Sequence, residues 1–176
     1  MVPSVAIKIE LVKDIKVKLH LAAGARLPVR ATNGAAAYDV AALLPLDTYL
    51  EILPGERMLV PTGLFFEIPT GYLISLRPRS GLALKSGVTL LNSPATIDSD
   101  YRGELKVILI NLGANNFRIN SGDRIAQLLL ERSEKVEWDL MDNHDELSES
   151  ERGAGGFGSS GIESNNSSGN LHRGFA

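Results

Sequence analysis

The sequence predicts an all-β fold of the sandwich or barrel type. Apolar and polar residues alternate strictly over Ile15–Leu21, which is the pattern of a half-buried strand. Turn residues such as Pro54-Gly55 and Ser121-Gly122-Asp123 recur between short apolar runs. No long window repeats apolar residues at helical spacing. Many short strands separated by frequent turns are typical of sandwiches and barrels.

The expected strands are short, and each is bounded by turn signals such as Pro61-Thr62-Gly63 or Pro69-Thr70-Gly71. One short helical turn is expected at Gly81–Lys85. In chain order, the strands are expected at Ala6–Val12, Ile15–Leu21, Tyr38–Ala42, Tyr49–Leu53, Arg57–Pro61, Leu64–Ile68, Tyr72–Arg77, Val88–Leu91, Leu105–Leu112, Asn116–Ile119, Arg124–Glu131 and Val136–Asp139.

The composition changes after Trp138, which predicts the end of the core. We expect a β core over residues 1–140, an acidic linker over 141–151, a glycine-rich arm over 152–161 and a disordered tail over 162–176. The arm places one arginine and one phenylalanine among glycines and serines. Glycine amides can surround a phosphate, an arginine can pair with it, and a phenylalanine can stack on a base. The alternative is that the arm is part of a disordered tail.

The overall composition excludes several classes of protein. The chain has 176 residues, no cysteine and three histidines far apart, which argues against disulfides, thiolate metal sites and multi-histidine metal sites. The net charge of −3 argues against general binding to nucleic acid or to an anionic membrane. No segment has the length and apolarity of a membrane span, and the N-terminus lacks a secretory signal pattern. We therefore expect a soluble, cytoplasmic protein.

The densest group of polar residues lies between Arg77 and Gly103. Arg79-Ser80-Gly81 combines a charged donor, a hydroxyl and a glycine at the end of an expected strand, which suits an anion. Asp98 follows in an apolar-flanked turn near Tyr101, where a carboxylate can orient or deprotonate a water. For each of these, an ordinary polar turn is the alternative.

These residues belong to five motifs that occur in the order found in one enzyme family. The chain resembles the trimeric dUTP diphosphatases (dUTPases). The motifs that carry the resemblance are Ala35-Ala36-Ala37-Tyr38-Asp39-Val40, Pro78-Arg79-Ser80-Gly81-Leu82-Ala83, Asn92–Gly103, Gly122-Asp123-Arg124-Ile125-Ala126-Gln127 and Arg152–Gly161.

The resemblance implies a jelly-roll-like β fold and a homotrimer with active sites at subunit interfaces. In that family one subunit supplies the first, second and fourth motifs, another the third, and the last subunit the fifth. The implied reaction is hydrolysis of dUTP to dUMP and pyrophosphate, which limits uracil incorporation into DNA and supplies dUMP for thymidylate synthesis. Fully extended, the stretch from Trp138 to Arg152 reaches about 45–50 Å, enough for the arm to close on a neighbour.

The resemblance also implies a role for each motif residue. Asp98 would activate the water that attacks the α-phosphorus, and Tyr101 would lie under the deoxyribose and exclude a 2′-hydroxyl. Phe157 would stack over uracil. Uracil would be read by Asn92, Thr96, Ile97 and the backbone up to Tyr101. The phosphates would be bound by Arg79, Ser80, Gly81, Gln127, Arg152, Gly158 and Ser159.

The resemblance implies roles for three further positions, and two of them, Lys106 and Asp39, have an alternative interpretation. Lys106 matches a position near substrate, although it is also compatible with a surface strand lysine. Arg124 matches an arginine that braces the trimer in relatives. Mg²⁺ would be held mainly by the substrate phosphates, with Asp39 accepting a hydrogen bond from a metal-bound water. The alternative for Asp39 is a buried aspartate that satisfies backbone amides.

Some positions depart from the family pattern, and two other functions remain open. Ala37 and Ala95 stand where relatives usually carry glycine, which matters if either position needs a positive φ. Ser160 replaces threonine, a minor change.

A dCTP deaminase would carry a glutamate where this chain has Ile108. A non-catalytic trimer of the same fold would have lost Asp98 or the arm, and this chain has both.

Overall fold

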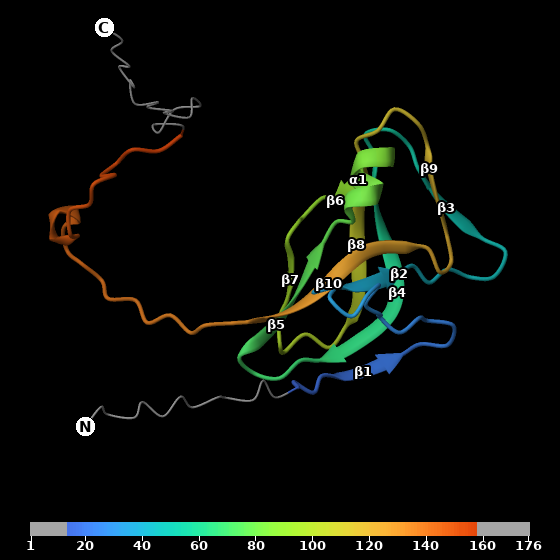
Figure 1. Cartoon of the computed structure of the whole chain (residues 1–176), viewed down its shortest axis with the longest axis horizontal. Coiled ribbons are helices and arrows are strands. Elements are labelled where there is room, and N and C mark those ends of the chain that lie inside the picture. The colour runs from blue at the N-terminus through green and yellow to red at the C-terminus, as the bar shows by residue number, and fades with distance from the viewer. Residues whose placement is uncertain (1–13, 158–176) are drawn as a thin grey trace, which may run out of the picture. The chain divides into compact units, whose positions relative to one another are not determined.

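The computed structural model describes residues 14–157, so the strand expected at Ala6–Val12 and the tail over 162–176 lie outside the described residues. The chain divides into two units, one ending at Lys135 and the other beginning at Val136. The first unit carries every strand of the described residues (Figure 1). The all-β prediction is confirmed.

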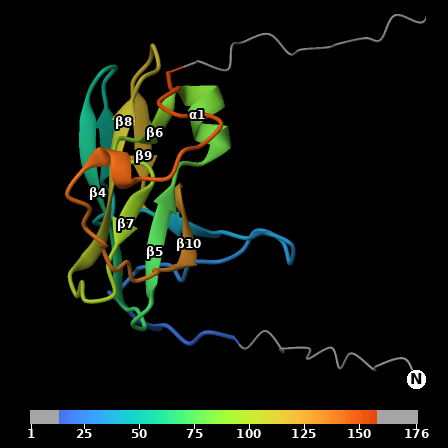
Figure 2. The same ribbon diagram turned by 90° about the vertical axis from the view of Figure 1, so that its left-hand side faces the viewer.

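Two four-stranded sheets build the first unit. One has the order β1-β4-β8-β6 and the other β2-β10-β5-β7, and β3 and β9 form a separate pair. Figure 2 shows β4 and β8 on one side and β5 and β10 on the other. The strands are β1 (Lys18–Leu21), β2 (Tyr38–Ala41), β3 (Tyr49–Ile52), β4 (Arg57–Glu67), β5 (Tyr72–Arg77), β6 (Val88–Leu90), β7 (Ala95–Ile97), β8 (Glu104–Asn111), β9 (Phe117–Asn120) and β10 (Arg124–Arg132).

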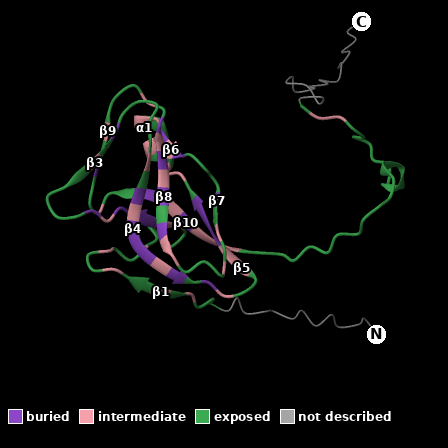
Figure 3. Ribbon diagram, turned by 180° about the vertical axis from the view of Figure 1, so that it is seen from behind, coloured by how far each residue is buried: buried purple, intermediate pink, exposed green. Residues whose placement is uncertain are grey.

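Alternation along the strands explains the core of this unit. In β8 every second residue from Leu105 to Asn111 is buried, and buried residues also run along β4 (Figure 3). Aliphatic side chains from both sheets, such as Val60, Val107 and Leu76, are at most 1 % exposed. Removing this apolar surface from water is the main stabilising contribution to the sandwich.

One expected break between strands is a bulge instead. The strands predicted at Arg57–Pro61 and Leu64–Ile68 form the single strand β4. Its register against β8 shifts between Pro61 and Leu64, so Thr62 and Gly63 are extra residues. Gly63 has φ +67°, and a Cβ there would lie 2.5 Å from a side-chain atom of Leu43. The turn signal was therefore real, but it marks a bulge that bends a continuous strand.

Two strand expectations differ from the structure, and the expected helical turn is confirmed. The strand predicted at Val136–Asp139 is absent, because these residues have no strand partner among residues 14–157. The short strand β7 was not predicted, since Ala95–Ile97 lies within a motif rich in turn residues. The helical turn expected at Gly81–Lys85 is part of α1 (Ser80–Ser86), which ends at Gly87 in a left-handed conformation. A 3-10 turn, His144–Glu146, lies in the second unit.

Candidate active site

Three neighbouring strands bring the first, second and fourth motifs together. Gln127 of β10 is opposite Asp39 of β2 on one side and opposite Arg77 of β5 on the other. Arg79, two residues after the end of β5, is the N-cap of α1, and Arg124 begins β10. The sheet order β2-β10-β5 therefore places motif residues that are distant in the sequence at one level of the sheet.

Asp39, Arg79 and Arg124 form what we call the acid–arginine cluster. The Asp39 side chain is only 5 % exposed. Arg124 Nη1 donates to Asp39 Oδ2 at 2.8 Å, and Arg79 Nε lies 3.2 Å from Asp39 Oδ1. Arg79 Nη1 also donates to the Arg124 carbonyl oxygen at 2.9 Å. A buried carboxylate requires such partners, because desolvation otherwise penalises its charge strongly.

The cluster fixes the direction of Arg79. Its guanidinium is restrained by a carboxylate and a carbonyl oxygen, and its side chain remains 25 % exposed. Ser80 and Gly81 are exposed at the start of α1, and Gln127 is half-buried beside them in the sheet. The region thus offers an oriented cation next to neutral polar groups, which is suited to a phosphate chain.

The residues around the cluster offer little to a metal ion directly. Among residues 14–157 there is no group of three histidine, aspartate or glutamate side chains that could hold a metal. Asp39 Oδ1 is buried and forms an ion pair with Arg79 but accepts no hydrogen bond within the described chain, so it retains capacity to accept one. This donor set fits an ion that takes most of its ligands from a substrate and water, with Asp39 as an acceptor.

The third motif lines a separate pocket of about 300 Å³, which we call the Asp98 pocket. It lies between the loop carrying the motif and strand β8. Six of the predicted site residues meet there. The lining residues are Leu59, Asn92, Ala95, Thr96, Ile97, Asp98, Tyr101, Glu104, Lys106 and Ile108.

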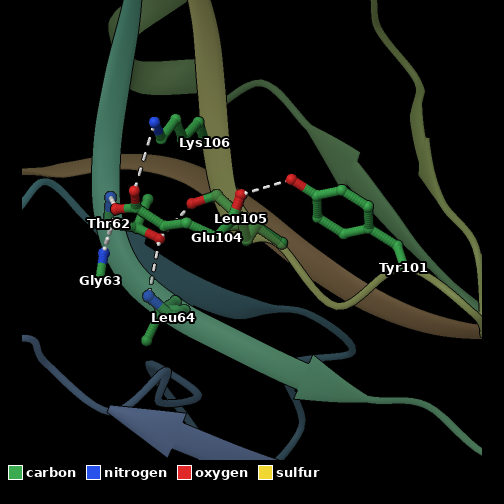
Figure 4. Close-up of polar contacts among 7 residues, drawn as sticks. All are labelled: Thr62, Gly63, Leu64, Tyr101, Glu104, Leu105 and Lys106. Atoms are coloured by element: carbon green, nitrogen blue, oxygen red, sulfur yellow. Dashed lines mark hydrogen bonds and ion pairs between the residues drawn. The ribbon is translucent and has the colours of Figure 1, made fainter. Parts of the chain in front are cut away.

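Asp98 and Tyr101 sit on a tight turn at the rim of this pocket. The Tyr101 amide donates to the Asp98 carbonyl oxygen at 3.2 Å, and the Tyr101 hydroxyl donates to the Glu104 carbonyl oxygen at 3.0 Å (Figure 4). The Asp98 carboxylate is exposed and makes no hydrogen bond or ion pair with any described residue. A carboxylate in this state can accept a proton from a water in the pocket.

Gly103 and Glu104 make contacts next to Tyr101 that the motif pattern alone did not reveal. A Cβ on Gly103 would lie 2.4 Å from the Tyr101 hydroxyl oxygen, so only glycine allows the ring to fold back over the chain. Glu104 lies at the first position of β8 and contacts the β4 bulge through its side chain. A glutamate at a strand start is normally interpreted as solvent-facing, and no sequence signal marks it otherwise.

The two regions lie at opposite ends of the β5–β7 pair. Leu76 pairs with Ala95 and Ile74 with Ile97. Asp98 therefore follows the end of β7 that is remote from Arg77. A strand rise of about 3.3 Å per residue puts about 13 Å between the levels of Asp98 and Arg77, and Arg79 lies beyond Arg77. Within one chain, the structure does not bring the two sets of residues together.

The second unit contains the described part of the arm. Arg152 Nε donates to the Gly155 carbonyl oxygen at 2.7 Å, and the Gly153 amide donates to the Ser150 hydroxyl at 3.1 Å. The Phe157 ring is fully exposed. Gly158 and Ser159, which the sequence also placed in the site, lie outside the described residues.

Comparison with known proteins decides the family. The family model described as dUTPase matches residues 23–161. The chain belongs to the dUTPase family. A deoxyuridine 5'-triphosphate nucleotidohydrolase of Brucella melitensis is 52 % identical over 145 residues, which cover 82 % of this chain and 90 % of that protein. The enzyme of the same name from Rhizobium meliloti is 50 % identical over 84 % of this chain and 90 % of its own length.

Solved dUTPase structures share the fold. A variant of the Staphylococcus bacteriophage 80alpha dUTPase, solved with dUpNHpp, aligns with a TM-score of 0.72 and 26 % identity. The alignment covers 84 % of this chain and 99 % of that one. A phage phi11 dUTPase variant, in which a structural Mg(II) ion is coordinated, shares the fold at a TM-score of 0.65 and 22 % identity, over 74 % of this chain and 99 % of that one. The jelly-roll-like fold predicted from the motifs is confirmed, and the chain is a hydrolase of nucleotide metabolism.

The unusual alanines of this dUTPase cause no backbone strain. Asp47 and Phe157 are the non-glycine residues with positive φ between residues 14 and 157. Ala37 and Ala95 are not among them, and Ala95 is a buried residue of β7. Within the described residues, no helix is long and apolar enough to cross a membrane.

Proposed function

We propose that this chain hydrolyses dUTP to dUMP and pyrophosphate by attack of water on the α-phosphorus. The observation that carries the proposal is the Asp98 pocket, where an unpaired carboxylate and the Tyr101 ring line one cavity of about 300 Å³ in a chain of the dUTPase family. Related enzymes are named deoxyuridine 5'-triphosphate nucleotidohydrolases. Because the substrate is a free nucleotide, we infer that the enzyme acts in the cytoplasm.

Asp98 is the general base of this proposal. Its carboxylate is exposed at the pocket and accepts no hydrogen bond from the described residues, so its lone pairs remain available to a water. The water gives a proton to Asp98 as its oxygen attacks phosphorus, and pyrophosphate leaves with the electrons of the phosphoanhydride bond. Such a positioned base typically contributes about 10²–10⁴-fold to the rate.

The base and sugar of dUTP occupy the same pocket. Asn92, Thr96 and Ile97 line it and present polar and backbone groups to uracil, and Tyr101 packs on the deoxyribose. A pocket whose groups hydrogen-bond one base leaves them unpaired with another, which penalises the wrong nucleotide.

The triphosphate extends to the residues of the second, fourth and fifth motifs. Arg79 supplies a charge whose direction is set by Asp39, and Lys106 adds an ammonium at the pocket. Mg²⁺, bound to the phosphates, would neutralise charge and favour in-line geometry. Asp39 Oδ1 is the acceptor in this chain that would hold one of its waters. The other proposed phosphate ligands are Ser80, Gly81, Gln127, Arg152, Gly158 and Ser159, and Phe157 covers the uracil.

One substrate can contact Asp98 and Arg79 together if they come from different subunits. Their separation along the β5–β7 pair supports a site shared between copies of the chain. We therefore propose a homotrimer with three sites at its interfaces, and an arm that closes over a neighbour's site and excludes water.

A dCTP deaminase is the alternative from another reaction class. Ile108, at the position where that enzyme would need a glutamate, lines the Asp98 pocket and offers no acid there. Incubation with dUTP, dCTP, dTTP and UTP in the presence of Mg²⁺, with pyrophosphate and ammonia both measured, separates the possibilities. The expected result is pyrophosphate from dUTP alone. Ammonia from dCTP, or no product from any nucleotide, would contradict the proposal.

A further inference from the structure

Glu104 lines the Asp98 pocket, yet no motif role accounts for it. Its side chain is only 21 % exposed, and its carboxylate accepts hydrogen bonds from β4. The contacts begin at the β4 bulge, where Thr62 and Gly63 leave the ladder with β8. The amides of these two residues need another acceptor, because an unpaired buried N–H is costly.

The Glu104 carboxylate is that acceptor. Its Oε1 atom accepts from the Thr62 amide at 3.1 Å and from the Gly63 amide at 2.8 Å. Thr62 is 1 % exposed, so water does not replace this partner easily. The Thr62 hydroxyl also donates to the Leu105 carbonyl oxygen (Figure 4). The start of β8 is thereby attached to the bulge on both sides of the Glu104–Leu105 peptide.

The same residue, Glu104, also contacts two residues that line the Asp98 pocket, Tyr101 and Lys106. The Glu104 carbonyl oxygen accepts the Tyr101 hydroxyl, so the position of the Tyr101 ring depends on where the Glu104 backbone is held. The second carboxylate oxygen, Oε2, lies 3.5 Å from Lys106 Nζ. Figure 4 shows both contacts next to the bulge. One side chain thus couples the bulge to Tyr101 and to Lys106.

We propose that Glu104 is a positioning residue for sugar selectivity. Its carboxylate holds the first residues of β8 against the bulge, and this keeps the Tyr101 ring where a 2′-hydroxyl has no room. The inference rests on the proposed function, in which Tyr101 packs on the deoxyribose. It makes the rejection of ribonucleotides by Tyr101 depend on a side chain outside the five motifs.

The test compares kcat/KM for dUTP and UTP in Glu104→Ala, Glu104→Gln and the wild type, by pyrophosphate release. In Glu104→Ala the dUTP preference should fall about tenfold or more, because small displacements at a reacting site have large effects on rate. Glu104→Gln should keep the preference within about threefold, since its amide oxygen can accept both N–H groups. Glu56→Ala is the matched control, because Glu56 Oε2 accepts the Leu53 amide at 3.4 Å in a turn before β4.

Tyr101→Phe completes the experiment. It removes the hydroxyl that contacts Glu104, so it should also reduce the dUTP preference, and the double variant with Glu104→Ala should lose no more than the larger single loss. Tyr101→Phe tests the contact to the Glu104 carbonyl oxygen by itself, so an unchanged dUTP preference in this variant overturns the inference even if Glu104→Ala does not fold.

Several outcomes contradict the inference. An unchanged dUTP preference in Glu104→Ala or in Tyr101→Phe overturns it, and so do fully additive losses in the double variant. If Glu56→Ala lost as much of the dUTP preference as Glu104→Ala, the loss would reflect general destabilisation and the inference would be wrong. A wild type that does not hydrolyse dUTP instead contradicts the proposed function, which keeps the two failures distinct.

Discussion

The acid–arginine cluster and the Asp98 pocket are organised in opposite ways. In the cluster, the carboxylate of Asp39 is 5 % exposed and lies within 3.2 Å of two guanidinium groups. In the pocket, the carboxylate of Asp98 is exposed and has no hydrogen-bond partner in the described chain. The fold of a single chain therefore supplies charged partners for the Asp39 carboxylate and none for the Asp98 carboxylate among the described residues. An acid with its partners in place orients other groups, whereas an acid without partners can take a proton.

The largest expected effect comes from the unpaired acid. Asp98→Asn should lower kcat by about 10²–10⁴-fold, because the amide cannot accept the proton of the attacking water. Binding of dUTP, measured by calorimetry, should persist, and the melting temperature should be unchanged since the side chain is exposed. Hydrolysis at the wild-type rate would remove Asp98 from the mechanism.

Truncation after Leu147 tests whether hydrolysis of dUTP at the Asp98 pocket requires the glycine-rich arm. The shortened chain keeps every strand found among residues 14–157, so it should fold and assemble. Its kcat/KM for dUTP should fall about 100-fold, because closure over the substrate is lost. Steady-state kinetics and light scattering measure both properties. An intact kcat/KM would contradict the role given to Arg152 and Phe157.

Asp39→Asn removes the carboxylate charge at the centre of the acid–arginine cluster. The free energy of unfolding should fall by about 1.5–3 kcal/mol, since a charge-assisted hydrogen bond to Arg124 is weakened. Arg79 loses its ionic partner, so kcat/KM should fall about tenfold. Glu67→Gln is the control, because Glu67 pairs with Lys18 at 2.8 Å but is exposed. Equal effects of the two substitutions on kcat/KM would contradict the inference that the acid–arginine cluster orients Arg79.

The smallest effect is expected at Lys106. Its ammonium lies at the pocket and 43 % of the side chain is exposed. Lys106→Met should raise KM for dUTP about threefold with little change in kcat, as expected for one solvent-screened charge. An unchanged KM in initial-rate kinetics would support the alternative of a surface lysine.

The sequence predicted the fold class because strand alternation and turn residues are local signals. It divided β4 in two, since Pro61-Thr62-Gly63 has the composition of a turn whether the chain reverses or only bulges. It missed β7, whose three residues directly follow the turn residues Asn92-Ser93-Pro94. It expected a strand at Val136–Asp139, where apolar alternation is present but no partner strand is available in the described chain.

For the site, the motifs identified residues but not the geometry that connects them. Asn92, Asp98 and Tyr101 do meet in one pocket. The two arginines around Asp39 become neighbours through the sheet order β2-β10-β5, which no local pattern encodes. Glu104 was missed for the same reason, because its partners Thr62 and Gly63 lie on another strand.

Mixing two inactive variants tests the central claim, that Asp98 of one subunit acts with Arg79 of another. Asp98→Asn and Arg79→Ala are each expected to be inactive alone. After co-refolding in equal amounts, random trimers should regain about a quarter of the wild-type activity, because a quarter of the sites combine an intact Asp98 with an intact Arg79. No recovery in assembled mixed trimers, or a chain that remains monomeric, would contradict the account.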